Sequence, residues 1–207
     1  MPLFGRRGAA AERRGTPADL LVVGLGNPGP QYEHSRHNVG ADTVALLADR
    51  HDGTLRRGRE RALTAEVRID EARVALAFPQ TFVNLSGESV ARLVRRHGID
   101  DPARLVVVHD ELDLPLGRVK VKQGGGLAGH NGLRSIKAHL HTDEFLRVRI
   151  GVGKPPTKER GADHVLRRVS KRERTELDVA VEEAADAVEA ILADGVDAAM
   201  NRYNTRA

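Results

Sequence analysis

From Asp19 onward the chain alternates short apolar runs with segments of helical periodicity. LLVVG, from Leu20 to Gly24, is continuously apolar, and RLVVVHD, which ends at Asp110, carries a second such run. Runs of this length are typical of strands buried on both faces. Two further segments, LTAEVRI and ARVALAF, have a period of two and are separated only by Asp70 and Glu71, so they predict a hairpin.

Helical patterns fill the intervals between these strands. VGADTVALLADRH and NLSGESVARLVRRHG each place apolar side chains on one face, and Gly98 ends the second helix. HNGLRSIKAHLH predicts a third helix. Ser170 and Glu173 form a capping box that opens a long helix extending through Leu192.

Two more segments, GRVKVKQ and FLRVRIGVG, alternate like strands, and in the first Lys120 and Lys122 lie opposite Val119 and Val121. Strands interspersed with helices are typical of the α/β class. We therefore expect a single-domain three-layer α/β/α fold in which a mixed central sheet is flanked by helices.

Length and composition restrict the domain organisation and the possible chemistry further. The 207 residues favour one domain, which we place at residues 19–207, preceded by a flexible basic tail at residues 1–18 that has no periodicity. The absence of cysteine excludes thiol nucleophiles and thiolate metal sites. No apolar stretch is long enough to span a membrane and no secretory signal is visible, so we expect a cytoplasmic protein. The net charge of +4 permits a polyanionic partner without identifying one.

His37 and Asp110 each lie just past a predicted buried strand. Active sites of open α/β sheets gather beyond the carboxyl ends of strands, so these two side chains are expected to meet. A histidine oriented by a carboxylate is a general base that works near neutral pH. Each residue also has a structural explanation, His37 as a histidine near a helix start and Asp110 as a turn former.

The glycine pattern GLGNPG follows the first strand and matches the spacing of a dinucleotide-binding loop. Pro28 and Pro30 suit a turn instead of a loop that opens into a helix, so a nicotinamide site is disfavoured. The turn does supply Asn27 at the end of the strand. An ordinary turn residue is the alternative interpretation for Asn27.

A second glycine-rich stretch, QGGGLAGHNGL, precedes His130, Asn131 and a predicted helix start, where a phosphate can approach the backbone closely. Asn84 lies at another helix start, where an N-cap is the usual explanation. The histidine pairs at 34 and 37 and at 139 and 141 lack a further ligand at a recognisable spacing, so no metal site is expected.

The chain resembles the bacterial-type peptidyl-tRNA hydrolases in four motif regions: GLGNPGPQYEHSRHNVG, QTFVNLSGESV, VHDELDLPLGRVKVKQGGGLAGHNGL and FLRVRIGVGKP. They occur in that family's order and spacing, from about Leu20 to the C-terminal helices. The resemblance implies a monomeric hydrolase without metal or cofactor that cleaves the ester between an N-blocked peptide and the 3′ end of tRNA. Such an enzyme recycles peptidyl-tRNA released prematurely from ribosomes.

The resemblance also implies roles for individual residues. His37 is the implied general base and Asp110 its partner, while Asn27 binds the peptide next to the ester. The implied substrate and tRNA contacts are Tyr32, Phe82, Asn84, Asn131, Lys122 and Arg149, with Lys158 as a further candidate for a phosphate contact.

Two departures from the family pattern are visible. Val83 stands where methionine is usual, and Leu127 stands where many members have histidine. The alternatives are a non-catalytic RNA-binding protein on the same fold, the nicotinamide enzyme, and a serine hydrolase. Ser35 and Ser86 lie in no G-x-S-x-G elbow, which disfavours the last.

Overall fold

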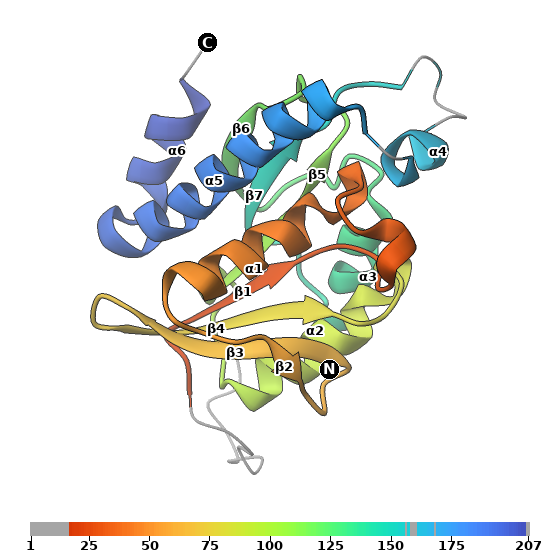
Figure 1. Cartoon of the computed structure of the whole chain (residues 1–207). Coiled ribbons are helices and arrows are strands. Elements are labelled where there is room, and N and C mark those ends of the chain that lie inside the picture. The colour runs from red at the N-terminus through yellow and green to blue at the C-terminus, as the bar shows by residue number, and fades with distance from the viewer. Residues whose placement is uncertain (1–16, 156, 158–160, 168, 206–207) are drawn as a thin grey trace.

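The computed structural model describes residues 17–155, 157, 161–167 and 169–205. In this part of the chain one sheet has the strand order β2-β3-β4-β1-β5-β7-β6 (Figure 1). The strands are β1 (Leu20–Gly24), β2 (Arg56–Arg57), β3 (Ala62–Ile69), β4 (Ala72–Pro79), β5 (Leu105–Glu111), β6 (Val119–Gln123) and β7 (Leu146–Gly151). The central pairs β4–β1, β1–β5 and β5–β7 are parallel and the outer pairs are antiparallel, which confirms a mixed sheet.

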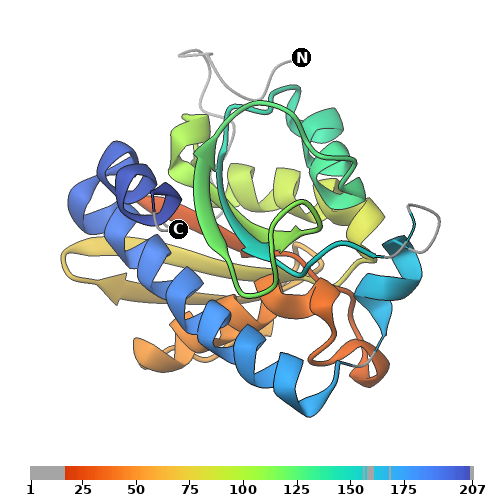
Figure 2. The same cartoon turned by 90° about the horizontal axis from the view of Figure 1, so that it is seen from above.

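Helices cover both faces of the sheet (Figure 2). One layer contains α1 (Val39–Arg50), α5 (Lys171–Asp194) and α6 (Val196–Asn204), and the other contains α2 (Ser86–Arg96) and α3 (Asn131–Leu140). A short helix, α4 (Gly161–Leu166), precedes α5. Single 3-10 turns lie at η1 (Pro30–Tyr32), η2 (Arg36–Asn38), η3 (Val83–Leu85) and η4 (Pro102–Arg104). The expected three-layer α/β fold is confirmed.

The continuous apolar runs are buried because the sheet is covered on both sides. Leu20 and Val22 of β1 pack in the core beneath α1 and α5, whereas Leu21 and Val23 pack beneath α2 and α3. Alternate residues of a strand point to opposite faces, so each run supplies both cores.

Two glycines bring α1 against the sheet. A Cβ on Gly24 would lie 2.1 Å from the carbonyl oxygen of Gly40, and a Cβ on Gly40 would lie 2.2 Å from that of Val108. Either approach is closer than a side chain tolerates. Because α1 begins two residues after His37, this contact also fixes where His37 stands.

Most predicted elements are present, and the exceptions are short. Ser170 and Glu173 form the predicted capping box. The sequence did not predict β2, α4 or α6. Asn84 is not an N-cap, because it lies inside η3 and no side chain caps α2.

The proposed flexible tail falls mostly on residues 1–16, outside the described part of the chain. Ala18, which we had assigned to the tail, is buried, and its N–H donates to the carbonyl of His97 at 3.0 Å. The packed domain therefore includes at least this residue before Asp19. Among the described helices, none combines the length and apolar character needed to cross a membrane.

Candidate active site

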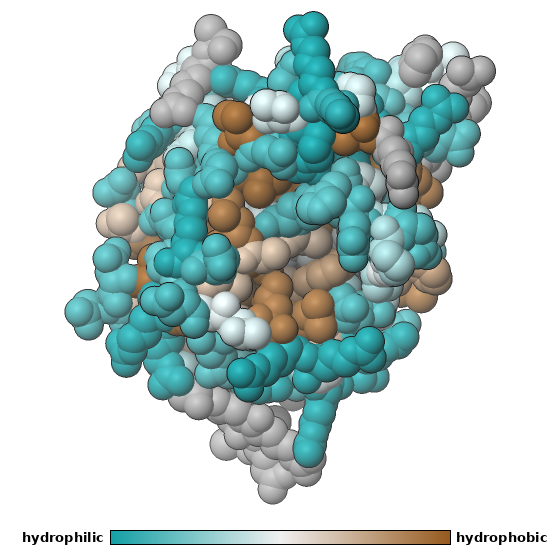
Figure 3. All heavy atoms as spheres, in the orientation of Figure 1, coloured by the Kyte–Doolittle hydropathy of each residue, from teal (hydrophilic) through white to brown (hydrophobic). Residues whose placement is uncertain are grey.

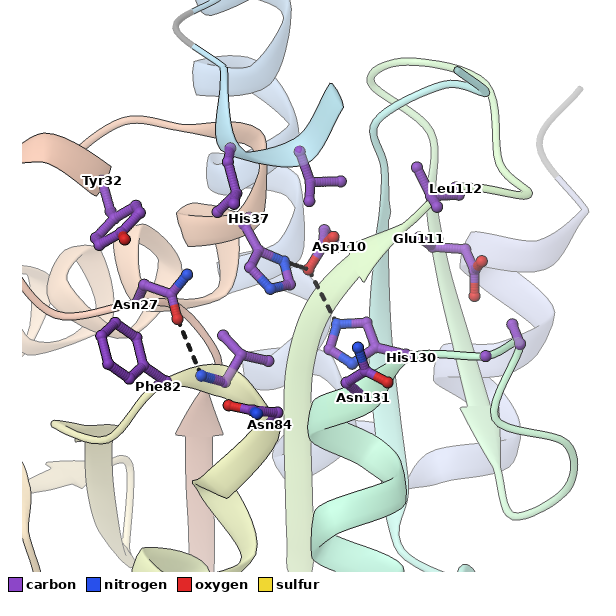
Figure 4. Close-up of a pocket in the computed structure, with 15 residues that line it drawn as sticks. Asn27, Tyr32, His37, Phe82, Asn84, Asp110, Glu111, Leu112, His130 and Asn131 are labelled. Carbon is purple, nitrogen blue, oxygen red and sulfur yellow. Dashed lines mark hydrogen bonds and ion pairs between the residues drawn. The ribbon is translucent and has the colours of Figure 1, made fainter. Parts of the chain in front are cut away.

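A pocket of about 550 Å³ opens beyond the carboxyl ends of β1, β4 and β5 (Figure 4). Seven of the predicted site residues line it: Asn27, Tyr32, His37, Phe82, Asn84, Asn131 and, at its floor, Asp110. The remaining lining residues are Val83, Glu111, Leu112, Ala128, Gly129, His130, Val165 and Leu166. The structure thus gathers side chains from five separate segments of the chain, four of which carry the predicted site residues.

His37 and Asp110 meet as expected. Nδ1 of His37 lies 2.9 Å from Oδ1 of Asp110. The Asp110 side chain is only 3 % exposed, while that of His37 is 16 % exposed, so the ring can reach a bound substrate. A carboxylate in this position accepts the hydrogen of Nδ1 and leaves Nε2 as the nitrogen able to take a proton.

A second histidine, His130, uses the same carboxylate oxygen. Its Nε2 lies 3.0 Å from Oδ1 of Asp110, and its Nδ1 accepts the N–H groups of Gly132 and Leu133 at 3.1 and 3.3 Å, which caps α3. A nitrogen that accepts two N–H groups carries no hydrogen, so the hydrogen of this ring is on Nε2 and is donated to Asp110. Both nitrogens of His130 are therefore engaged, in contrast to those of His37.

The surroundings shift the pKa values of this pair in opposite directions. Burial by itself lowers the pKa of His37, but the charge of Asp110 and the hydrogen bond to it more than compensate, and the pKa lies above its ordinary value. Burial would raise the pKa of Asp110, whereas His37 and then His130 hold it well below its usual range. Asp110 is thus an anion at neutral pH, and His37 is a stronger base than a free histidine.

His109 lies behind the site on β5. It is fully buried, its Nδ1 is 2.7 Å from the carbonyl oxygen of Asp110, and its ring meets that of His130 edge-on at 4.9 Å between centroids. Burial lowers the pKa of His109 well below its ordinary value. This neutral ring supports His130 from behind and has no access to the pocket lining.

The side chain of Asn27 is held in one orientation. Its Oδ1 accepts the backbone N–H of Val83 at 2.9 Å, so the Nδ2 group is directed to the pocket as a donor (Figure 4). The buried side chain of Asn38 bonds both the N–H and the carbonyl of Asn27, each at 2.9 Å. Asn38 therefore fixes the turn that presents Asn27.

The other predicted substrate residues form the rim. Tyr32 and Phe82 flank Asn27 on one side, and Phe82 is 55 % exposed, so an aromatic face is open to a ligand (Figure 4). Asn131 is exposed on the opposite side of the opening, and the exposed Asn84 lies between Phe82 and Asn131. Oδ1 of Asn131 accepts a hydrogen bond from Arg134, which leaves its amide hydrogens for a ligand. Ser35 and Ser86 are buried and do not line the pocket.

The predicted phosphate contacts lie outside the pocket lining. Lys122 is partly buried on β6, beside Gly125. Arg149 on β7 forms an ion pair with the buried Glu111, at 3.1 Å. Lys158 falls outside the described residues.

The glycine-rich loop is tethered by a buried arginine. Arg147 donates to the carbonyl oxygens of Gly124, Gly125 and Gly126, the last two at 2.9 and 2.8 Å. Gly126 and Gly129 have open space around the position of a Cβ. The loop is thus anchored at its first half and open where it approaches the pocket.

The segment that carries His37 is tied to the C-terminal part of the chain. The buried guanidinium of Arg36 donates to the carbonyl of His164 at 3.1 Å and to Glu173 at 2.6 Å. These bonds and those of the capping box lower the pKa of Glu173 to about 2, the backbone N–H of Ser170 contributing most.

A metal ion would find one set of ligand atoms in the described residues. Nitrogens of His37 and His130 and an oxygen of Asp110 lie within 4.8 Å of one another. The two nitrogens that face Asp110 each donate a hydrogen to its carboxylate. A nitrogen that carries a hydrogen cannot bind a metal ion, so the geometry fits a hydrogen-bonded network better than a metal site. The expectation of a metal-free site stays a prediction.

Sequence reasoning missed His130, His109, Asn38 and Glu111 as parts of the site. His130 had been noted only as the residue before a helix start. The available signal was the position of His130, two residues before a helix N–H group that has no partner within the helix. A histidine nitrogen at this position can accept that hydrogen and cap the helix. No sequence signal indicated that its other nitrogen reaches Asp110.

In a mixed α/β fold, a histidine oriented by a buried carboxylate in an open pocket is the arrangement of a general base, as hydrolases use. A model of the family described as peptidyl-tRNA hydrolase matches residues 21–207, and the chain belongs to this family. This confirms the resemblance seen in the motifs and the expected hydrolase. The non-catalytic RNA-binding alternative is not favoured.

Individual relatives agree with this assignment. A peptidyl-tRNA hydrolase of Frankia alni is 51 % identical over 184 residues, covering 89 % of this chain and 93 % of the relative. That of Rhodococcus erythropolis is 50 % identical over 185 residues, with 89 % and 97 % covered. The crystal structure of the Acinetobacter baumannii enzyme superimposes with a TM-score of 0.85 at 38 % identity, covering 91 % of this chain and 96 % of that one.

Proposed function

We propose that the chain hydrolyses the ester joining an N-blocked peptide to the 3′ end of tRNA, with His37 as the general base and water as the nucleophile. The observation that carries the proposal is the hydrogen bond between His37 Nδ1 and the buried carboxylate of Asp110. It makes Nε2 the basic nitrogen at the pocket surface. Family membership supports the substrate, because the relatives carry this activity in their name.

The reaction needs one oriented water and one base. Nε2 of His37 takes a proton from water while the water oxygen attacks the ester carbonyl carbon, and the carbonyl electron pair moves to oxygen. Asp110 stabilises the imidazolium that forms. When the intermediate collapses, the bond to the 3′ oxygen breaks and His37 returns its proton to that oxygen. The products are a free peptide acid and a tRNA with an intact 3′ hydroxyl.

Amide side chains provide the donors. Nδ2 of Asn27 binds a carbonyl oxygen of the peptide next to the ester, while Asn84 and Asn131 orient the water and the developing oxyanion. Asn27 thereby distinguishes a blocked α-amino group from a free one, since a free ammonium would be desolvated beside an amide donor and an aromatic wall. Tyr32 and Phe82 contact the terminal nucleotide or the peptide.

Outside the pocket, Lys122 and Arg149 hold phosphates of the acceptor arm. The protein acts in the cytoplasm, where its substrate arises, as a monomer without an obligate protein partner. These points are part of the proposal.

The decisive experiment compares His37→Ala with the control His34→Asn. His34 lies in the same segment, is 71 % exposed and has a φ of 57°, which asparagine tolerates. With N-acetyl-aminoacyl-tRNA and a chelator present, kcat of His37→Ala falls by about 10²–10⁴-fold. Circular dichroism and tRNA binding stay unchanged, and His34→Asn keeps wild-type turnover. Near-normal turnover of His37→Ala would refute the mechanism.

A further inference from the structure

Arginines without a partner gather on the molecule at a place separate from Lys122 and Arg149. Residues 56–61 read RRGRER, four arginines and one glutamate, a net charge of +3 within six residues. The whole chain has a net charge of +4. β2 and the loop that joins it to β3 therefore carry a local excess of positive charge.

This loop faces α2 across a surface hollow. Arg59 and Glu60 of the loop and Arg92 and Arg96 of α2 line a hollow of about 410 Å³, which we call the arginine hollow. Arg56 pairs with Thr64 of β3, two residues from Ala62, and Ala62 belongs to the core beneath α2. Because residues two apart share a face, the side chain of Arg56 lies on the α2 side as well. Figure 3 shows hydrophilic side chains along the lower edge of the molecule, over β2 and the start of β3.

The nearby carboxylates do not neutralise this charge. Glu60 accepts from Arg96 at 2.9 Å, and Glu88 accepts from Arg61 at 2.5 Å. Within the described residues, the side chains of Arg56, Arg59 and Arg92 form no hydrogen bond or ion pair. Arg57 follows Arg56 in β2 and therefore points to the opposite face of the sheet, away from the hollow.

Arg50 contrasts with the unpaired arginines of the hollow. On the α1 side of the sheet, Arg50 alone contacts three carboxylates, those of Glu182, Asp186 and Glu189. Like charges held close together repel one another unless an anion lies between them. The unpaired arginines of the hollow thus form a positively charged surface, and we expect an anion from outside the protein to neutralise it.

We propose that the arginine hollow binds backbone phosphates of the tRNA substrate. Guanidinium groups stay charged at all relevant pH values and match phosphate oxygens with paired N–H groups, so they suit phosphodiesters better than a diffuse counter-ion. A polyanion also supplies several charges at once, as the three unpaired arginines on the α2 side, Arg56, Arg59 and Arg92, require. This inference rests on the proposed function and adds a contact surface to it.

The hollow lies at the same end of the sheet as the pocket. Ala62 of β3 pairs with Pro79 of β4, and the N–H of Gln80 donates to the carbonyl of Arg61 at 2.7 Å, just before the segment that carries Phe82 and Asn84. Lys122 lies on β6, at the other edge of the sheet. With neighbouring strands about 4.8 Å apart, the two edges are separated by roughly 25–30 Å. The pocket lies between two basic surfaces, and a substrate as long as tRNA reaches both.

The test uses Arg59→Ala with Arg92→Ala, and the control double variant Arg68→Ala with Arg172→Ala. The control removes the same charge from exposed positions on the far part of β3 and on α5. Each variant is assayed with full-length N-acetyl-aminoacyl-tRNA and with N-acetyl-aminoacyl-adenosine, at several salt concentrations. A filter-binding assay with deacylated tRNA accompanies the kinetics.

For full-length substrate we expect the hollow variant to have a KM about tenfold higher than wild type. The slope of its log KM against log salt concentration is smaller by about two, because two phosphate contacts are lost. Cleavage of the adenosine ester is unchanged, and the control behaves as wild type. Equal behaviour of both double variants on full-length tRNA refutes the proposal, as does an equal loss on both substrates.

Failure of the wild-type protein to cleave either substrate would overturn the proposed function instead. The hollow is then judged by filter binding alone: weaker tRNA binding by the hollow variant than by the control supports it, and equal binding refutes it.

Discussion

One carboxylate oxygen, Oδ1 of Asp110, serves two histidines that have different freedom. His130 is engaged at both ring nitrogens, since protonating Nδ1 would break the cap of α3. His37 is engaged only at Nδ1. The hydrogen-bond pattern alone therefore selects His37 as the ring that can gain and lose a proton during turnover.

The raised pKa of His37 predicts the pH dependence of the rate. The base works only when neutral, so kcat/KM falls on the acid side with a pKa above the ordinary histidine value of 6.5. In Asp110→Asn the charge that raises this pKa is gone while burial still lowers it, so the acid limb moves to lower pH. Turnover also falls, by less than in His37→Ala.

Profiles of kcat/KM between about pH 5 and 9 check this expectation. Asp113→Asn is the control, because Asp113 is exposed and three residues further along the chain. An acid limb at the same pH in Asp110→Asn and wild type would contradict the assignment.

The site residues that could be predicted from the sequence are those placed by the ends of strands. Asn27 follows β1, Asp110 lies near the carboxyl end of β5, and His37 lies in η2 between β1 and α1, so the edge of the parallel sheet brings the three together. His130 and Asn38 escaped because their roles depend on which way a side chain turns. Neither ring orientation nor the fold-back of an amide onto a residue 11 positions earlier is encoded in a periodic pattern.

Among the elements, α1 owes its position against the sheet to the absence of a side chain at Gly40. Gly40 lies between the backbones of β1 and β5, where a Cβ would meet Val108 O at 2.2 Å and Leu25 N at 2.7 Å. Backbone atoms in a sheet cannot give way as a flexible side chain does. The start of α1, and His37 with it, depends on this gap.

We therefore predict that Gly40→Ala lowers the free energy of unfolding by about 3 kcal/mol and also reduces kcat. The matched control is Gly126→Ala, since a Cβ at Gly126 has nothing within 4 Å. Urea unfolding measures the first effect and single-turnover hydrolysis the second. Equal stability of both variants would show that α1 can shift without cost.

Elements with a long periodic pattern were predictable, and short ones were not. The hairpin of β3 and β4 and the capped start of α5 follow directly from spacing. β2 has two residues and α4 has six, too few to establish a period. α6 buries only Ala199 and Tyr203, so it lacks an apolar stripe of its own.

For the molecule as a whole, the class was predictable and the strand order was not. Side-chain alternation tells which face a residue occupies but not which strand is its neighbour. The ion pair of Arg149 with Glu111 is a consequence of such a neighbour relation, because β5 and β7 pair in parallel. Because Arg149 is paired with the buried Glu111, its substitution is expected to affect stability as well as phosphate binding.

Lys122 and Arg149 are predicted to behave differently. Lys122→Ala raises KM for full-length tRNA substrates and flattens the salt dependence by about one, with unchanged stability. Arg149→Ala leaves the buried Glu111 without its partner and costs about 1–3 kcal/mol of stability in addition to any loss of RNA affinity. Adding Glu111→Gln restores part of that stability.

Thermal unfolding together with salt-dependent kinetics distinguishes these effects. Arg68→Ala is the control, because it removes an exposed charge on β3, away from β6 and β7. Unchanged stability of Arg149→Ala would mean that Glu111 does not need a cation.

The pocket wall has a consequence for the order in which the protein becomes active during synthesis. Val165 and Leu166 line the pocket, and Arg36 bonds to His164, so residues near the end of the chain complete a site that begins at Asn27. Ribosomes deliver the N-terminal part first. A nascent chain that already contains His37, Asp110 and Asn131 still lacks one side of its pocket until residue 166 of 207 has emerged. The finished site is thus a late product of translation.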